Sequence, residues 1–183
     1  MHRKTAKELL ADSFRELAQT RSIDRITIGD ICVNCGYSPA TFYRCFRDKY
    51  DLIAWDYSRR TARIMGLVDG KTYEWKQTLL DGAKHFHSEK EYLANLFQHT
   101  SGHDSCVRSM TEINFDLLKR HFLSASGKDA LSPSDELYLR IYCLGTVCLT
   151  CEWLLDKYDA SPEQIAEVYE NSLPLPLRKH LMN

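Results

Sequence analysis

The sequence has no uninterrupted run of about 20 apolar residues, which is the length that crosses a bilayer as a helix. Its most apolar stretch, residues 143–155, is shorter and contains Glu152. Residues 1–8 are largely charged and lack the apolar segment of a secretory signal peptide. We therefore expect a cytoplasmic protein that makes no contact with a membrane.

Motifs that carry catalysis are also missing. The sequence contains no glycine-rich phosphate loop, no nucleophile elbow and no pair of carboxylates in a recognisable catalytic setting. Active sites can be assembled from distant residues, so a helical enzyme or adaptor is kept as an alternative. The expectation is a protein that is not an enzyme, with no catalytic residues and no cofactor.

Seven cysteines are present, an odd number, and without an export signal reduced thiols are expected. Cys32 with Cys35, and Cys148 with Cys151, have the Cys-x-x-Cys spacing of redox or metal pairs, and Cys143 is near the second pair. Both pairs fall on apolar faces of predicted helices, where a thiol packs as a small hydrophobic group. A redox-responsive protein is the alternative reading of these pairs.

One further group has the spacing of metal ligands. His99, His103 and Cys106 would suit zinc if a single helix carried all three. The pair Ser101-Gly102 is expected to break that helix, and no fourth ligand is evident. We therefore predict no metal site, with a metal-responsive protein as the alternative.

Strand-like alternation is scarce, and glycine and proline gather at a few break points. Apolar residues instead recur at helical spacing, as Leu10, Phe14 and Leu17 do, which predicts an all-α fold. The predicted helices cover residues 4–20, 27–36, 38–46, 48–68, 72–87, 89–99, 105–123, 134–158 and 162 onward.

Residues 27–46 have the pattern of two short helices joined by a tight turn. Thr27 and Asp30 form a capping-box-like pair at the start of the first helix, which Gly36 ends in the left-handed conformation. Ser38 and Pro39 are an N-cap and first-turn pair for the second. Packed under the first long helix, this unit predicts a three-helix bundle with a helix-turn-helix.

The outward face of the second short helix indicates what the unit does. Phe42 and Phe46 are four residues apart and are expected to point into the bundle, which leaves a face of small, hydroxyl-bearing and cationic groups. Such a face suits the major groove of double-stranded DNA. Residues 1–60 carry a net charge of +3 (11 basic, 8 acidic), whereas residues 61–183 carry −4 (13 basic, 17 acidic). This split fits a head that faces phosphates.

From Ile26 to Leu52 the sequence resembles the DNA-binding signature of TetR-family transcriptional regulators. The shared pattern is Thr at the first cap, Gly at the turn, Ser after it, then an apolar–Tyr pair, Phe, Lys and Leu at fixed offsets. The resemblance implies a dimer on a palindromic operator, with an N-terminal DNA-binding domain in residues 1–50. It implies phosphate contacts from Thr27, Tyr43 and Lys49, and base or groove contacts from Ser38, Pro39, Ala40, Thr41 and Arg44.

Two positions depart from the family pattern. Cys45 stands where the family usually has Tyr or His, which removes one expected contact to the DNA backbone. Tyr50 replaces a frequent Glu. Operator affinity or geometry is expected to differ from the family norm for this reason.

Residues 51–183 are predicted to form a helical effector-binding and dimerisation domain. The helix over residues 134–158 is apolar nearly all round in its middle, so it must be buried on more than one side, and a second subunit is the simplest cover. We expect a homodimer through a four-helix bundle made by the last two major helices. The candidate interface residues are Leu137, Ile141, Leu144, Cys148, Cys151, Leu155, Ile165, Val168 and Tyr169.

The same half of the chain resembles the short regulatory domain of a Firmicutes-type TetR subgroup that includes the activator of dihydroxyacetone kinase operons. The resemblance is carried by helix lengths, by Trp75 and by the Leu-Pro residues near the C-terminus. It implies a small-molecule effector between the helices, or a protein co-regulator. The candidate pocket walls are Tyr57, Phe86, Phe97, Phe115, Phe122, Tyr142 and Trp153.

Overall fold

The structure is a computed structural model that describes residues 4–65, 74–99 and 103–182; the side chains of residues 99 and 103–106 are outside the description. Within these ranges the chain folds into helices and contains no strand, which confirms the predicted all-α class. The elements are α1 (Ala6–Ala18), η1 (Ile23–Arg25), α2 (Ile28–Cys35), α3 (Pro39–Cys45), α4 (Lys49–Met65), α5 (Trp75–Ser88), α6 (Lys90–His99), α7 (His103–Ser126), α8 (Pro133–Leu154), α9 (Pro162–Ser172) and α10 (Leu175–Leu181).

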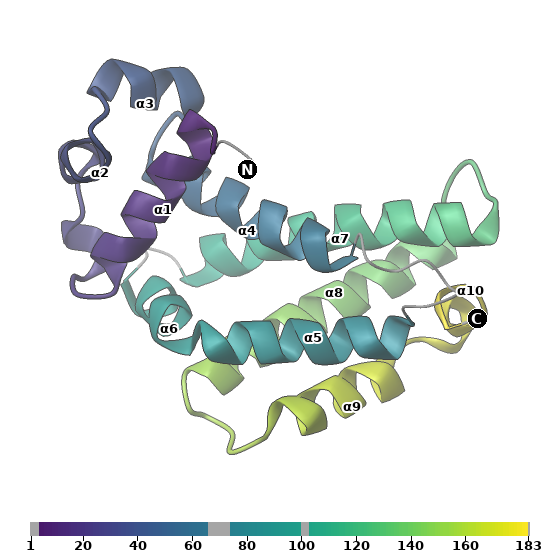
Figure 1. The fold of residues 1–183 in the computed structure, drawn as a ribbon. Helices are drawn as coiled ribbons and strands as arrows, with labels where there is room; N and C mark the ends of the chain where they lie inside the picture. The colour runs from purple at the N-terminus through teal and green to yellow at the C-terminus, as the bar shows by residue number, and fades with distance from the viewer. Residues whose placement is uncertain (1–3, 66–73, 100–102, 183) are drawn as a thin grey trace.

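The N-terminal helices α1, α2 and α3 form a small head at one end of the molecule, and α4 leads from it into the larger helical body (Figure 1). The core of the head is made by fully buried side chains from α1, α2 and α3 and from the start of α4. These include Phe14, Ile31, Phe42 and Leu52. Aromatic packing continues outward from Phe42 to Phe46, whose ring centroids are 5.8 Å apart. Because one apolar core joins the helices, the head is a compact support for α3.

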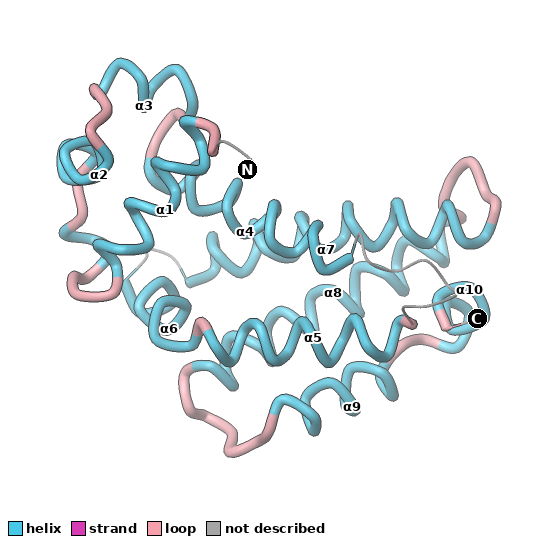
Figure 2. Tube along the Cα trace, in the orientation of Figure 1, coloured by secondary structure: helices cyan, strands magenta, loops and turns pink. Residues whose placement is uncertain are grey.

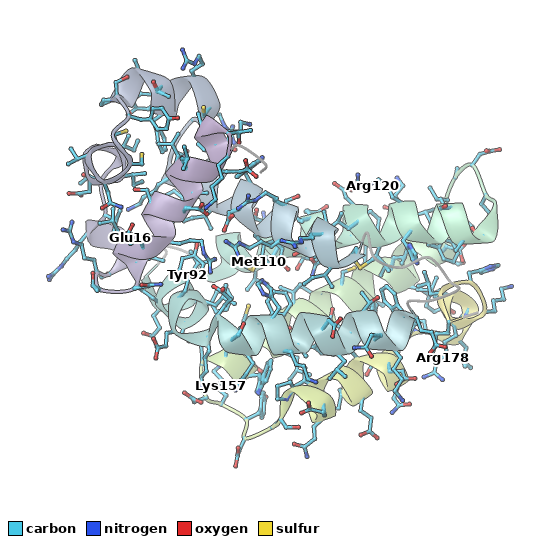
Figure 3. The ribbon with its side chains drawn as sticks, in the orientation of Figure 1. Glu16, Tyr92, Met110, Arg120, Lys157 and Arg178 are labelled. Atoms are coloured by element: carbon cyan, nitrogen blue, oxygen red, sulfur yellow. The ribbon has the colours of Figure 1, made fainter. Side chains whose placement is uncertain are left out.

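The body consists of α5 to α10 packed around the inner half of α4. Helices α7 and α8 lie side by side, α7 also packs against α4, α9 packs along α5, and α10 closes the far end (Figures 1 and 2). The inner side of α8 is buried, as at Leu139, Val147 and Leu154. Charged side chains such as Glu16, Arg120 and Lys157 project from the outer surfaces (Figure 3).

Helix α8 is long and apolar enough to cross a membrane by length and composition alone. Its most apolar 18-residue window has a mean hydropathy of 1.2, and 44% of that window is buried within the molecule. A core helix of a globular protein has the same length and composition. The buried side chains of α8 belong to the core of the body.

Several predicted helix bounds are corrected by the structure. Helix α7 continues to Ser126, and α8 ends at Leu154 instead of residue 158, because Asp156 adopts a left-handed φ of 61° that a helix cannot continue. Helix α10 was not predicted, although Pro174 and Pro176 precede apolar residues at helical spacing. The predicted helix end at residue 68 and the predicted helix start at residue 72 lie outside the described residues, as does the His99–His103–Cys106 group of side chains.

Candidate nucleic-acid interface and buried cavity

The start of α2 is fixed by a reciprocal cap. The Thr27 hydroxyl accepts a hydrogen bond from the Asp30 amide nitrogen at 3.1 Å, and the Asp30 carboxylate accepts from the Thr27 amide nitrogen at 2.8 Å. Hydrogen bonding to Thr27 holds the pKa of Asp30 below its ordinary value. The capping box predicted from the sequence is therefore confirmed, and it sets where α2 enters the head.

The turn between α2 and α3 depends on Gly36. Its φ of 73° lies in the left-handed region, where a Cβ is strained, and the Tyr37 amide nitrogen donates to the Cys32 carbonyl oxygen at 2.9 Å. Ser38 then caps α3 by accepting from the Thr41 amide nitrogen at 3.2 Å, with Pro39 in the first turn. These caps direct α3 across the head with one face buried and the other exposed.

The exposed face of α3 carries the residues expected to read DNA. Ser38, Pro39, Ala40 and Arg44 are exposed, Thr41 is half-buried and the Tyr43 side chain is 60% exposed. The opposite face holds Phe42, whose side chain has no exposed area. Among the described residues, no hydrogen-bond or ion-pair partner satisfies the Tyr43 hydroxyl or the Arg44 guanidinium. The geometry leaves both groups available to a ligand of the head.

The family resemblance implies phosphate contacts from Lys49 and Thr27, and in this structure both side chains form hydrogen bonds within the head. The Lys49 ammonium donates to the carbonyl oxygens of Ile23 (2.9 Å), Asp24 (3.3 Å) and Ile26 (3.2 Å), which uses its three donors inside the head. The Thr27 hydroxyl donates to the Asp30 carboxylate at 2.6 Å. Both residues therefore stabilise the approach to α2, and neither has a free donor for a phosphate.

A buried cluster of charges joins the head to the body. Asp56 of α4, only 2% exposed, accepts from Arg59 at 2.8 Å, from Arg60 at 2.9 Å and from Arg15 of α1 at 3.5 Å. Arg15 also pairs with Glu89, which follows α5. The cluster thus connects α1, α4 and the α5–α6 junction.

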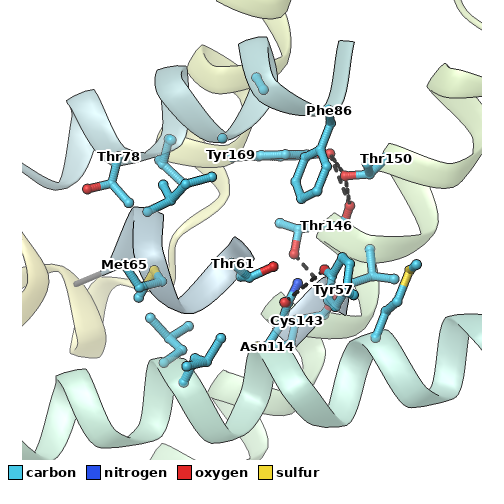
Figure 4. A pocket seen from close by; sticks show the side chains of 18 of the residues that line it. Tyr57, Thr61, Met65, Thr78, Phe86, Asn114, Cys143, Thr146, Thr150 and Tyr169 are labelled. Atoms are coloured by element: carbon cyan, nitrogen blue, oxygen red, sulfur yellow. Dashed lines mark hydrogen bonds between the residues drawn. The ribbon is translucent and has the colours of Figure 1, made fainter. Parts of the chain in front are cut away.

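A cavity of about 120 Å³ lies in the body between α4, α5, α6, α7, α8 and α9 (Figure 4). Of the predicted pocket walls, Tyr57, Phe86, Phe97 and Tyr142 line it. The rings of Tyr57 and Phe86 stack at 6.2 Å with an interplanar angle of 12°. Further lining residues, which were not predicted as pocket walls, are Thr61, Met65, Trp75, Thr78, Met110, Asn114, Cys143, Thr146, Thr150, Cys151 and Tyr169.

Three of the predicted pocket walls lie outside this lining. Phe115 and Phe122 belong to a separate apolar cluster near α10, and Trp153 donates through its indole nitrogen to the Ala160 carbonyl oxygen at 2.8 Å. The pocket prediction is revised accordingly. An aromatic stripe at helical spacing shows that a helix face is buried, but only the packing of neighbouring helices decides which part of that face borders a cavity.

The nine predicted interface residues fall into two groups. The side chains of Leu137, Ile141, Leu144 and Val168 are 62%, 71%, 50% and 46% exposed, while Cys148 and Leu155 are half-buried. Cys151, Ile165 and Tyr169 are buried within one chain, and Cys151 and Tyr169 line the cavity. The candidate interface is therefore revised to the exposed residues and their half-buried neighbours, because helices of the same chain cover the buried faces of α8 and α9.

The described cysteines are free thiols, and Cys32 and Cys143 are buried. Cys32 is buried and Cys35 donates to the Ile31 carbonyl oxygen at 3.1 Å. Burial raises the pKa of Cys32, and it raises the pKa of Cys143 to about 12. A thiol with a raised pKa is a poor source of the reactive thiolate. Among the described residues, no group of three or more His, Cys, Asp or Glu side chains is placed to hold a metal ion.

Two family models match the chain. The model of bacterial regulatory proteins of the tetR family matches residues 10–54, and a model described as a transcriptional regulator C-terminal region matches residues 73–174. No curated protein matches the sequence.

Solved structures with a similar fold are found over nearly the whole chain. The dihydroxyacetone kinase operon activator DhaS is 19% identical with a TM-score of 0.64, and the similarity covers 97% of this chain and 98% of that one. A TetR transcriptional regulator from Rhodococcus sp. RHA1 is 16% identical, with a TM-score of 0.67 and coverage of 96% and 99%. The TetR family repressor AlkX from Dietzia sp. strain DQ12-45-1b, implicated in biodegradation of n-alkanes, is 15% identical, with a TM-score of 0.59 and coverage of 100% of both chains. At these identities the likeness concerns the fold.

Proposed function

The chain belongs to the TetR family of bacterial transcriptional regulators, and we propose that it binds a palindromic operator as a homodimer under the control of a small molecule held in the body cavity. The observation that carries this proposal is the exposed face of α3, with Tyr43 and Arg44 free of partners within the described chain. Because its target is chromosomal DNA, the protein is proposed to act in the cytoplasm.

The exposed face of α3 supports separate contacts to base edges and to phosphates in DNA binding. Arg44 is proposed to contact base edges together with Ser38, Pro39, Ala40 and Thr41, since an Arg guanidinium can donate two hydrogen bonds to guanine in the major groove. Tyr43 is proposed to donate to a phosphate, which fixes the register of α3 in the groove. Lys49 and Thr27 are proposed to hold the head in shape.

The outer face of α8 supports a homodimer. Leu137, Ile141 and Leu144 form an exposed apolar stripe along this helix, and Val168 lies exposed on α9. Monomeric proteins rarely leave such contiguous apolar surface open to water. A twofold axis across the stripe would pair α8 and α9 with their counterparts and present two heads to two half-sites.

The contacts between the cavity lining and the head support control by an effector. A smaller cavity of about 20 Å³ shares Tyr57 and Phe86 with the main one and is also lined by Arg15 and Asp56. Tyr92 of α6, at the boundary between head and body (Figure 3), packs its ring against Phe14 at 6.3 Å. A ligand that shifts Tyr57 or Phe86 is thus proposed to change the contacts that orient the head.

Selection of bound duplexes from a random DNA pool, followed by gel mobility shift, tests the operator proposal. We expect a twofold-symmetric site, with an affinity that falls steeply as salt rises because phosphate binding releases counterions. An asymmetric site, or binding that does not depend on salt, would contradict the proposal.

Charge substitution in the α8 stripe tests the homodimer. Ile141→Glu is expected to give a monomer by sedimentation equilibrium and to weaken operator binding by on the order of 100-fold through loss of bivalency. Leu175→Glu is the matched control, because Leu175 is 78% exposed but lies on α10. A wild-type monomer, or a dimer that persists in Ile141→Glu, would refute this interface.

A further inference from the structure

The lining of the main cavity is uncharged. Its residues are aliphatic, aromatic, thiol, hydroxyl and amide side chains, and among the described residues that line it there is no Asp, Glu, Lys, Arg or His. An ion placed there would lose its hydration without gaining an opposite charge, which is costly. The thiol of Cys143 is also neutral, since burial raises its pKa to about 12. The cavity therefore selects against charged ligands.

Most of the polar side chains around the cavity already donate to backbone carbonyl oxygens. The Thr146 hydroxyl donates to the Tyr142 carbonyl oxygen at 2.8 Å, and the Tyr169 hydroxyl donates to the Thr146 carbonyl oxygen at 3.0 Å. Tyr142 donates to the Tyr169 carbonyl oxygen at 3.0 Å, and Thr78 to the Glu74 carbonyl oxygen at 3.3 Å. A polyhydroxylated ligand would find few free partners in such a lining.

Asn114 and Thr61 differ from this pattern. Tyr57 donates to the Asn114 amide oxygen at 2.9 Å, so the amide nitrogen keeps its two N–H groups, for which no described residue is a partner. Thr61 lies four residues after Tyr57 on the same face of α4, and its hydroxyl points into the cavity without a partner among the described residues (Figure 4). The indole nitrogen of Trp75, another lining residue, is also buried and has no hydrogen-bond partner in the described part of the chain. The Asn114 and Trp75 N–H groups can only donate, and the Thr61 hydroxyl can also donate, so an acceptor is the partner that would satisfy all three.

The size of the cavity sets the size of the ligand. An apolar cavity of roughly 150 Å³ binds one benzene ring, and this cavity measures about 120 Å³. Apolar side chains such as Leu79, Phe86 and Leu118 provide the surface that a ring or short hydrocarbon would cover.

We propose that the cavity binds a small, uncharged and mainly apolar molecule about the size of one aromatic ring, carrying a single acceptor oxygen that takes a hydrogen bond from the Asn114 amide nitrogen. This inference rests on the proposed function, since it names the chemical class of the effector. Thr61 lies one helical turn from Tyr57 and gives the same oxygen a second donor.

Three probes of similar shape test the class by isothermal titration calorimetry on the full-length protein. Acetophenone supplies the ring and one carbonyl oxygen, ethylbenzene lacks the oxygen, and benzoate carries a charge. We expect acetophenone to bind about 10-fold more tightly than ethylbenzene, the effect of one hydrogen bond, and about 100-fold more tightly than benzoate. Benzoate binding as tightly as acetophenone, or ethylbenzene binding equally well, would overturn the inference.

Substitution of the proposed donor locates the oxygen. Asn114→Leu preserves much of the side-chain shape and is expected to abolish the preference for acetophenone over ethylbenzene. Asn171→Leu, at an exposed asparagine on α9, should leave the preference intact. A preference that survives in Asn114→Leu would overturn the assignment.

The infrared carbonyl band of bound acetophenone provides a measurement that does not depend on a variant. A band at lower frequency than in hexane supports a hydrogen-bonded oxygen, and a band at the hexane frequency contradicts it. Operator binding without probe is measured separately by gel mobility shift. Normal operator binding without acetophenone binding overturns the ligand class alone, whereas failure to bind any operator overturns the proposed function.

Discussion

The side chain of Asn95, on helix α6 of the body, hydrogen-bonds the end of helix α1 in the head. Its amide nitrogen donates to the carbonyl oxygens of Ala18 and Arg21, both at 2.8 Å, and its amide oxygen accepts from the Ile23 amide nitrogen at 3.3 Å. A single residue of the body thus satisfies three backbone groups at the turn between α1 and η1, so α6 and this turn are expected to move together.

Replacing Asn95 with Ala should leave these three backbone groups without their partner. We expect the free energy of unfolding to fall by about 1 kcal/mol, the net contribution of a typical hydrogen bond, because the site is only partly buried and water can reach some of these groups. Gln98→Ala, at an exposed amide on the same helix, is the control. Urea denaturation measures both variants, and equal stability of the two would show that the Asn95 contacts contribute little.

Lys49→Met should act on stability rather than on phosphate contacts. Because the ammonium bonds three carbonyl oxygens around η1, its loss is expected to cost about 1–3 kcal/mol of unfolding free energy. The salt slope of operator binding, measured where the variant is folded, should match that of the wild type. A slope lower by about one counterion would instead identify Lys49 as a phosphate ligand. Arg47→Met serves as the neighbouring control, since the Arg47 side chain is 87% exposed.

Arg44→Ala and Tyr43→Phe should separate sequence reading from backbone binding. Loss of Arg44 is expected to cost about 1–3 kcal/mol on the preferred operator and to relax the base preference at one position of each half-site. Tyr43→Phe keeps the ring packed on Phe42 and should weaken binding to all sequences alike. Competition with single-base operator variants measures the difference, and an unchanged preference in Arg44→Ala would refute base reading by this residue.

His85, half-buried near the Asp56 cluster, should make stability depend on pH. Burial lowers the pKa of His85, and the charges of Arg60 and Arg15 lower it further despite Asp56. In the unfolded chain a histidine has a pKa of about 6.5. Below that pH, His85 therefore binds a proton more readily in the unfolded chain than in the folded protein. The free energy of unfolding should be independent of His85 above about pH 6.5 and should fall as the pH decreases below that value.

The variant His85→Gln is expected to reduce this loss of stability between about pH 6.5 and 5 in urea titrations. His121, whose pKa is also lowered by burial, acts in the same direction, so only part of the loss should disappear. His87→Gln, at an exposed histidine of the same helix, is the control. Identical pH dependence in His85→Gln and the wild type would exclude a contribution from His85.

Local chemistry explains why the head could be predicted in detail from the sequence. Thr27 with Asp30, Gly36, and Ser38 with Pro39 each act within a few residues of their own position, so their roles depend little on the rest of the fold. The family assignment is confirmed for the same reason, because its pattern consists of these caps and of core residues at fixed spacing. The contacts of Lys49 could not be predicted in this way, because they join residues 23–26 to the start of α4, more than 20 residues later in the sequence.

The body was less accessible to sequence reasoning. Thr146 and Thr150 are four residues apart on the apolar helix α8, a spacing that indicates polar groups on one face of the helix. Both residues hydrogen-bond the Tyr169 hydroxyl, which comes from α9 and could not be foreseen from their spacing. Likewise, Ile141 is exposed and Cys151 is buried on the same helix α8. This difference depends on which side of α8 the other helices cover.

The sequence by itself determined the all-helical class, the caps and turn of the helix-turn-helix, and the exposed residues of α3, because helix periodicity and capping are local properties of the chain. Only the tertiary structure decided that Lys49 bonds within the head, that Asn95 ties α6 to η1, and which aromatic residues border the cavity. These features arise where segments far apart in the chain meet, and their positions follow from how complete helices pack against one another.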